Sequence, residues 1–152
     1  MNKKIANATE ITVDGIKFQS KLEAKCYTLL KEAGLNFKYE QWCIELLKGF
    51  RPSFKVYEGY KGLLVQRVTK DNKNQIVRSI SYKPDFVYSD DSRLIIIETK
   101  GFKNDIYPIK RKLFFNTLNT LNSSLAIYFF EPSNITTVKQ TIEVIKKILD
   151  EI

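Results

Sequence analysis

Two carboxylates and a lysine stand at predicted strand ends within residues 84–100, where the chain reads P-D-F-V-Y-S-D-D-S-R-L-I-I-I-E-T-K. We expect a hairpin with Asp91-Ser92 as its two-residue loop, and this register sets Asp85 directly opposite Glu98. Side chains two apart on a strand point the same way, so Lys100 shares the face of Glu98. Two carboxylates beside an ammonium group suit a divalent cation and phosphate chemistry.

The expected burial of Glu98 distinguishes this arrangement from a surface turn that carries charged residues. Glu98 follows four consecutive aliphatic residues, 94–97, at the end of a predicted core strand. A carboxylate there is expensive to remove from water unless a positive charge compensates it. Mg²⁺ is a natural compensator because it prefers hard oxygen ligands and keeps several waters. The alternative is that Pro84-Asp85 only marks a turn, while Glu98 and Lys100 form an exposed ion pair of little energetic value.

Glu23 is the third candidate acidic residue, and two interpretations of it stay open. Ser20-Lys21-Leu22-Glu23 matches a capping box, in which Glu23 bonds back to the start of its helix. The alternative is that Glu23 points toward Asp85 and Glu98 as a further metal ligand. Glu40 is a weaker candidate for the edge of the same site.

Composition limits the available chemistry. The 152 residues contain no histidine, which excludes Ser-His and Cys-His nucleophilic systems and zinc sites that need histidine. Catalysis must therefore use carboxylates, lysine, tyrosine or a metal. The 25 Lys and Arg against 17 Asp and Glu give a net charge of +8, which favours a polyanionic partner such as nucleic acid. A solvated basic surface is the alternative.

Size and apolar patterning indicate one domain, residues 1–152, with a proper core and a polar, flexible segment at 1–10. No apolar run approaches the length of a membrane span, and the first residues lack the apolar stretch of a secretory signal. We interpret Cys26 and Cys43 as reduced and packed. The expected compartment is the cytoplasm.

Periodicity and capping residues predict the order helix, strands, helix, strand, helix, which indicates an α/β or α+β fold with a mixed sheet flanked by helices. The expected segments are a short strand or turn at 11–18, a helix from Ser20 to Gly34, an extended stretch at 35–47, a strand-rich region at 54–82, a helix at 103–121 with Pro108 in its first turn, a buried strand at 125–130 and a helix from 132. The apolar stripe of the last helix, residues 135–152, is either a face packed on the sheet or a dimer seam.

Between residues 55 and 83 the chain has seven basic and only two acidic residues. We expect a basic β-hairpin here, with 63–69 and 75–82 as its strands and a turn at 71–74. It is either a solvated hairpin or an arm laid along a phosphate backbone, with tyrosines 57, 60 and 82 interleaved. The basic residues proposed to contact DNA are Lys55, Lys61, Arg67, Lys70, Lys73, Arg78 and Lys83, together with Lys103, Lys110, Arg111 and Lys112 of the helix that follows.

The ordered set Glu23, Pro84-Asp85 and Glu98-Thr99-Lys100 resembles the restriction-endonuclease-like nucleases that bear the PD-(D/E)xK motif. Longer stretches extend the resemblance to small phage-encoded endonucleases of that superfamily, including Holliday-junction resolvases, over residues 13–130. These stretches are Asp14-Gly15-Ile16-Lys17-Phe18, Ser20-Lys21-Leu22-Glu23-Ala24, Pro84-Asp85-Phe86, Glu98-Thr99-Lys100-Gly101, and Tyr107 before Lys110-Arg111-Lys112-Leu113-Phe114.

The resemblance implies Glu23, Asp85 and Glu98 around Mg²⁺, for which Mn²⁺ is expected to substitute, and Lys100 beside the attacking water. It implies a DNA endonuclease whose expected substrate is branched DNA or a four-way junction. Two coordinated cuts favour a homodimer. The alternatives are a nicking or site-specific endonuclease of ordinary duplex, and a basic DNA-binding module with an inactive site. One departure is the 29-residue span 55–83, longer and more basic than a minimal member needs.

Overall fold

The structure is a computed structural model that describes residues 10–101, 104–121 and 124–150. Residues 1–9, expected to be flexible, lie outside the described residues, as does Lys103. The chain divides into two compact units, and each is considered by itself. The sheet unit comprises residues 1–43 and 83–152, and the ribbon unit is Ile44–Tyr82.

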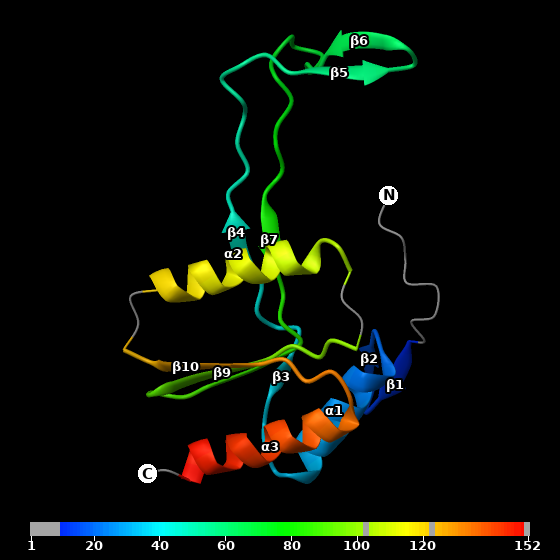
Figure 1. The fold of residues 1–152 in the computed structure, drawn as a ribbon. Helices are drawn as coiled ribbons and strands as arrows, with labels where there is room; N and C mark the ends of the chain where they lie inside the picture. Colours follow the sequence, from blue (N-terminus) through cyan, green and yellow to red (C-terminus); the bar gives the residue numbers. More distant parts are fainter. Residues whose placement is uncertain (1–9, 102–103, 122–123, 151–152) are drawn as a thin grey trace. The chain divides into compact units, whose positions relative to one another are not determined.

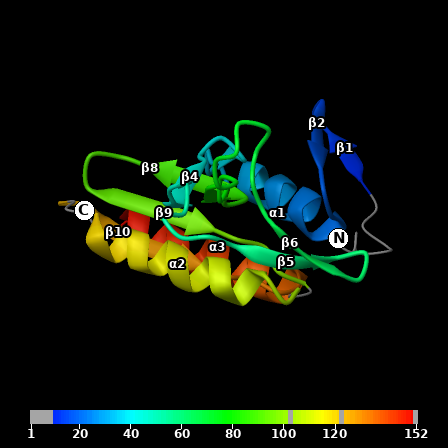
Figure 2. The ribbon, with the colours of Figure 1, turned by 90° about the horizontal axis from the view of Figure 1, so that it is seen from above.

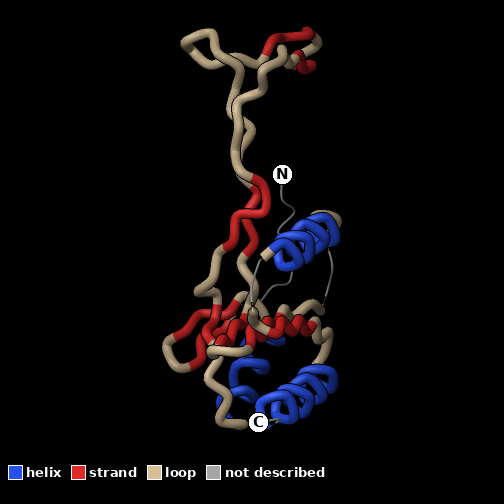
Figure 3. The backbone as a smooth tube through the Cα atoms, turned by 90° about the vertical axis from the view of Figure 1, so that its left-hand side faces the viewer, coloured by secondary structure: helices blue, strands red, loops and turns tan. Residues whose placement is uncertain are grey.

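The sheet unit contains a four-stranded mixed sheet in the order β10-β9-β8-β3. Strands β9 and β10 are parallel, and the other neighbours are antiparallel. Helix α2 covers one face, while α1 and α3 cover the other (Figures 1 and 3). The predicted α+β arrangement, a mixed sheet flanked by helices, is confirmed. The bounds are α1 Lys21–Glu32, β3 Lys38–Tyr39, β8 Phe86–Ser89, β9 Arg93–Ile97, α2 Tyr107–Thr120, β10 Ala126–Phe130 and α3 Ile135–Asp150.

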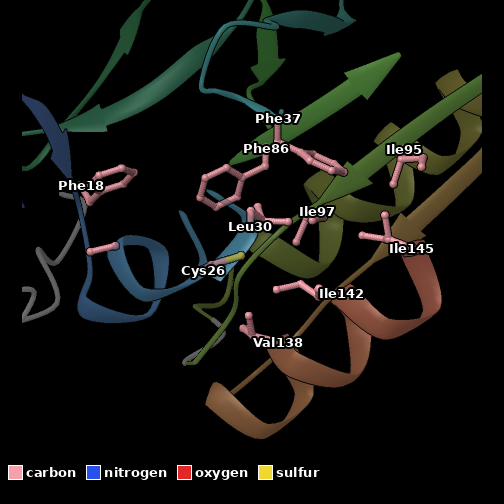
Figure 4. Close-up of a cluster of buried hydrophobic side chains, with 11 residues drawn as sticks. Phe18, Cys26, Leu30, Phe37, Phe86, Ile95, Ile97, Val138, Ile142 and Ile145 are labelled. Carbon is pink, nitrogen blue, oxygen red and sulfur yellow. The ribbon is translucent and has the colours of Figure 1, made fainter. Parts of the chain in front are cut away.

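Strand β9 is central because its apolar residues serve both faces of the sheet. Ile95 and Ile97 belong to the main core cluster, together with side chains from α1 and α3 (Figure 4). Ile96, on the opposite face by strand alternation, is equally buried. On α2, Phe114 is buried, and its ring centroid lies 6.1 Å from that of Phe129 on β10. A strand of continuous aliphatic residues therefore occupies the position expected for it.

Helix α1 begins directly after its predicted capping residue, Ser20. In α1, the Ser20 hydroxyl oxygen accepts a hydrogen bond from the Glu23 backbone N–H at 3.2 Å. The apolar stripe of α3 packs inside the chain, because Val138, Ile142 and Ile145 are buried in the core cluster. The packed-face interpretation is confirmed for these three residues, whereas Ile135 is exposed and Ile152 lies outside the described residues. Helix α2 begins at Tyr107, later than the expected residue 103.

A small hairpin precedes α1, where the sequence predicts a short strand or turn. Strands β1 (Ile11–Val13) and β2 (Ile16–Phe18) pair antiparallel. Their two-residue loop places Asp14 and Gly15 at φ values of 51° and 77°, a left-handed geometry that suits these residue types. Phe18 at the end of β2 is fully buried and joins the core cluster. The hairpin thus leads the chain into the cap of α1.

The ribbon unit consists of two antiparallel strand pairs, β4 (Ile44–Leu47) with β7 (Ile80–Tyr82), and β5 (Tyr57–Tyr60) with β6 (Leu63–Gln66). The two pairs lie at opposite ends of this ribbon (Figure 1). The expected hairpin between residues 63–69 and 75–82 forms only next to its turn, where the Gln75 backbone N–H donates to the Arg67 carbonyl at 3.3 Å; farther from the turn the expected pairing is wrong. A two-residue turn at Lys61-Gly62 folds β6 back onto β5, and β7 pairs with β4 instead.

The two cysteines differ in environment. Both are free thiols, Cys26 is buried, and burial raises its pKa to about 12. Cys43 is exposed, so the expectation that both cysteines are packed is wrong for Cys43. It lies in the connection between β3 and β4. Among the described residues, no helix has both the length and the apolar character required to cross a membrane.

Candidate active site

The β8–β9 hairpin sets the register of the candidate site. Phe86 pairs with Ile97, so Asp85 and Glu98 are the next opposed positions beyond the end of the ladder. The Asp90 backbone N–H donates to the Arg93 carbonyl at 3.0 Å, which leaves the residues between them as a two-residue loop. Figure 2 shows β8 and β9 lying next to one another. The predicted register is therefore confirmed.

Asp85 is a buried, firmly oriented carboxylate. Its Oδ2 accepts hydrogen bonds from the Thr99 backbone N–H at 2.7 Å and from the Thr99 hydroxyl at 2.6 Å. Burial, and next the charge of Glu98, raise the pKa of the Asp85 carboxyl to about 8, although the Thr99 hydrogen bonds act in the opposite direction. These surroundings therefore favour the protonated form of the carboxyl unless a cation compensates its charge.

Glu98 is the most deeply buried carboxylate of the site, with 3% of its surface exposed. Its Oε1 accepts from the Lys100 ammonium group at 2.9 Å. Its Oε2 is buried and has no hydrogen-bond partner. A buried carboxylate oxygen without a donor costs free energy, and such an atom is suited to a positively charged ligand. The structure thus brings together Asp85, Glu98 and Lys100, as the strand register predicts.

Lys100 rests on a network that the sequence interpretation missed. Its Nζ lies 4.4 Å from the ring centroid of Tyr107, a cation–π contact. The buried Tyr107 hydroxyl donates to Glu131, which also accepts from the Arg111 guanidinium Nε at 2.8 Å. Burial, and next the hydrogen bond to Glu131, raise the pKa of Tyr107. The available clue was Glu131 directly after β10, beside β9, after which Glu98 follows directly.

Glu23 is engaged by its own helix start and by a neighbouring strand. Its Oε1 accepts from the Ser20 hydroxyl at 2.8 Å, and its Oε2 accepts from the Gln19 backbone N–H at 3.0 Å and from the Tyr39 hydroxyl at 2.6 Å. These contacts support the capping interpretation. The charge of Glu23 still contributes to the raised pKa of Asp85. A ligand role for Glu23 stays a prediction.

Two carboxylates of the site, those of Asp85 and Glu98, stand at opposed positions of the β8–β9 hairpin. Among the described residues, no three Asp, Glu or Cys side chains are grouped so that they alone hold a metal ion. A cation at this place would therefore bind Asp85 and Glu98 and complete its shell with water or phosphate oxygens, as Mg²⁺ often does. Glu40 lies at the edge, where its backbone N–H donates to the Asp85 carbonyl at 2.8 Å and its side chain pairs with Lys83 at 3.7 Å.

The other basic residues expected to contact DNA fall in both units. In the sheet unit, Lys83 and Lys112 are exposed, while Arg111 is held by Glu131 and stacks on Phe115, with 4.3 Å between the guanidinium carbon and the ring centroid. Arg111 therefore also has a structural role. In the ribbon unit, Arg67 pairs with Glu58 at 3.0 Å. The exposed ones there are Lys55, Lys61, Lys70, Lys73 and Arg78.

Comparison with known proteins identifies a family. Searches of curated proteins and of solved structures found no match. The family described as "Protein of unknown function (DUF1064)" matches residues 3–130, a stretch that holds Glu23, Asp85, Glu98 and Lys100 together with the whole ribbon unit. This match covers most of the chain, which therefore belongs to the DUF1064 family.

Proposed function

We propose that this chain is a metal-dependent endonuclease that hydrolyses phosphodiester bonds of DNA. The observation that carries the proposal is the Glu98 carboxylate, buried opposite Asp85, paired with Lys100 through one oxygen and without a hydrogen-bond partner at the other. Such an oxygen is tolerated when a cation or a donor arrives from outside the chain. The net charge of +8 supports a polyanionic substrate.

The residues present fit Mg²⁺ or Mn²⁺. Both are hard cations that take carboxylate oxygens, and Asp85 and Glu98 supply two such groups on opposed strands. When bound, the metal ion would lower the pKa of a coordinated water and neutralise charge on a phosphate. Glu23 is the proposed third acidic residue; from its cap it acts through its charge and its hydrogen bond with Tyr39.

The chain's own groups supply position and charge. Thr99 holds one oxygen of Asp85, which fixes the direction of that carboxylate. Lys100 is held between Glu98 and the Tyr107 ring, so its ammonium group is placed before a substrate arrives. An ammonium at this point orients a water molecule or stabilises negative charge on a phosphate, and preorganised charge is a large catalytic contribution.

A cleavage assay with matched variants tests the proposal. The purified chain is incubated with labelled four-way junction and linear duplex in Mg²⁺, Mn²⁺ or EDTA. Glu98→Ala and Lys100→Ala are expected to lower the cleavage rate at least about 100-fold. Glu143→Ala and Lys146→Ala are the controls, since they remove an exposed ion pair of the same residue types on α3 and leave the candidate site intact. These controls are expected to cleave within about twofold of the parent chain.

Two results contradict the proposal. One is an absence of cleavage of every DNA with either metal, and the other is undiminished cleavage by Glu98→Ala. Tight, salt-dependent DNA binding that Glu98→Ala leaves unchanged, without cleavage, would instead assign the chain to the inactive DNA-binding class.

We further propose branched DNA, in particular a four-way junction, as the substrate, a homodimer as the acting species and the cytoplasm of a bacterial or phage-infected cell as the compartment. Two coordinated cuts at one junction require two equivalent sites, which a symmetric dimer supplies. Symmetric cuts near the branch point support this substrate, whereas equal rates on linear duplex favour a nicking or site-specific enzyme. Sedimentation of the chain with and without junction DNA tests the dimer.

A further inference from the structure

The ribbon unit exposes an unusual share of the chain's apolar side chains. Nine of the 14 exposed large apolar side chains in the described residues lie within Ile44–Tyr82. Among them, Leu63 and Leu64 are exposed to 68% and 74%. Within this unit only Pro52 and Tyr82 are buried, so the ribbon has no apolar core of its own. Apolar surface concentrated in this way marks a contact surface.

The β5–β6 hairpin exposes apolar side chains on both of its faces, beside Glu58 on one face and Gln66 on the other. Strand alternation and the pairing of Tyr60 with Leu63 place these two side chains together on one face, with Val65. Tyr57 and Leu64 lie on the other face. Both tyrosines are more than half exposed, at 52% and 56%. A two-stranded ribbon that packs neither face is marginal in water, and a ligand that stacks on it adds to its stability.

The turn of this hairpin contains a lysine, Lys61, in a backbone conformation that lysine rarely adopts. Lys61 and Gly62 have φ values of 48° and 78°, the geometry of a hairpin turn that favours Asn-Gly or Gly-Gly. A lysine with positive φ is strained, and such strain concentrates at functional positions. The Lys61 ammonium lies 5.3 Å from the ring centroid of Tyr60, so cation and aromatic ring are presented together.

Charge decides which partner suits this surface. The ribbon unit has eight Lys and Arg against three Asp and Glu, so it holds five of the eight net positive charges of the chain. A second copy of so basic a surface would be repelled, whereas a polyanion is attracted. Flat apolar rings next to cations match nucleotides whose bases are unpaired, because bases stack on the rings while phosphates meet the cations.

We propose that the β5–β6 hairpin binds unpaired bases of DNA, which stack on Tyr60 on one face and on Tyr57 on the other, while Lys61 contacts the phosphate adjacent to the base on Tyr60. The inference rests on the proposed nucleic-acid substrate and specifies its form: DNA with single-stranded or unstacked nucleotides. Paired bases in a duplex keep their faces stacked on one another, so they do not offer this surface to the tyrosines.

Binding of the full chain to three DNAs of equal length, in EDTA to prevent cleavage, tests the site by fluorescence anisotropy. The DNAs are a single strand, a matched duplex and a duplex with a central unpaired stretch. The parent chain is expected to bind both DNAs with unpaired bases at least about tenfold more tightly than matched duplex at equal salt. Tyr57→Ala and Tyr60→Ala are each expected to lose about 5- to 100-fold on single strand and under about twofold on duplex.

Two further variants separate stacking from charge and from folding. Tyr60→Phe keeps the ring and is expected to bind like the parent, which distinguishes lost stacking from a misfolded hairpin. Lys61→Ala is expected to weaken binding to all three DNAs alike and to reduce the salt slope by about 1, whereas the tyrosine variants leave the slope unchanged. A 2-aminopurine in the unpaired stretch is expected to be quenched by the parent chain more than by Tyr60→Ala.

The proposal is overturned by equal affinity of the parent for single strand and matched duplex, or by tyrosine variants that weaken both equally. It is also overturned if Tyr57→Ala or Tyr60→Ala converts a sedimenting dimer into a monomer without changing DNA preference, since the ribbon would then bind a second copy. Preference for unpaired DNA without cleavage in Mg²⁺ would leave this site standing and refute the nuclease. Cleavage in Mg²⁺ without a preference for unpaired DNA would support the nuclease and refute this binding site.

Discussion

Replacing Asp85 with asparagine is expected to stabilise the metal-free protein. The asparagine amide oxygen still accepts from the Thr99 backbone N–H and hydroxyl, which bond the same atom position in the parent. The amide NH₂ group takes the place of the other carboxylate oxygen and is a hydrogen-bond donor next to Glu98, whose charge acts on Asp85 and whose Oε2 has no hydrogen-bond partner. The variant therefore keeps the shape of the site, removes one charge and offers Glu98 a donor.

The size of the effect depends on pH because the pKa of the Asp85 carboxyl is raised from 3.8 to about 8 by burial and by the charge of Glu98. Below pH 3.8 the carboxyl is protonated in both the folded and the unfolded chain. Between that pH and about 8 only the unfolded chain ionises, so the free energy of unfolding falls as pH rises, and above about 8 the loss is complete. One pH unit in this window corresponds to about 1.4 kcal/mol for one proton. Water entry and local rearrangement reduce the total, for which we expect about 2–4 kcal/mol.

Urea unfolding of parent and Asp85→Asn in EDTA, from pH 5 to 8.5, measures this difference. The variant is expected to gain relative to the parent as pH rises, because its side chain cannot ionise. Adding Mg²⁺ at ten times its dissociation constant is expected to stabilise the parent by about 1.4 kcal/mol and the variant by much less. Asp90→Asn is the control and is expected to lower the free energy of unfolding. Hydrogen bonds, first from the Ser92 backbone, lower the pKa of Asp90 to about 2, so its ionised form stabilises the folded chain. A variant less stable than the parent at pH 8 would refute the reasoning.

Three further predictions concern groups around the site. Glu23→Ala is expected to lower the free energy of unfolding by about 1–2 kcal/mol in urea titrations, because the Gln19 N–H and the Tyr39 hydroxyl lose their acceptor. Tyr107→Phe keeps the ring beneath Lys100 and is expected to retain more cleavage activity than Tyr107→Leu, measured as kcat at saturating DNA; equal losses would contradict the ring contact. A maleimide is expected to label Cys43 within minutes and Cys26 only on unfolding, read by mass spectrometry, because Cys26 is buried and its pKa is raised to about 12.

The parts of the site that the sequence predicts are those set by strand register. Side chains alternate with a period of two, and the two-residue loop after Asp90 fixes which residues are opposed. The positions of Asp85, Glu98 and Lys100 follow from these two facts alone. The capping box at Ser20 is similarly local, and the contacts of Glu23 with Gln19 and Ser20 needed no knowledge of the fold.

The ribbon unit shows where local rules fail. The turn between β5 and β6 contains Lys61 before Gly62, and lysine is not typical of a two-residue hairpin loop. The residues 71–74 offer stronger turn chemistry, and a turn does form there, with the Asn72 N–H donating to the Thr69 carbonyl at 2.9 Å. However, β7 pairs with β4, more than 30 residues earlier in the chain, and no local pattern specifies that partner. Tertiary pairing here overrides the nearest hairpin.

The charges of the site explain why its elements belong together. Without a cation, burial and the charge of Glu98 favour the protonated form of Asp85, and Glu98 is paired with Lys100. The proton on Asp85 lowers the cost of burying these carboxylates. A divalent cation bound by Asp85 and Glu98 would displace that proton and make the summed charge of the site more positive by one. A phosphate would then be attracted more strongly than by the metal-free site, which is what the proposed metal-dependent cleavage requires.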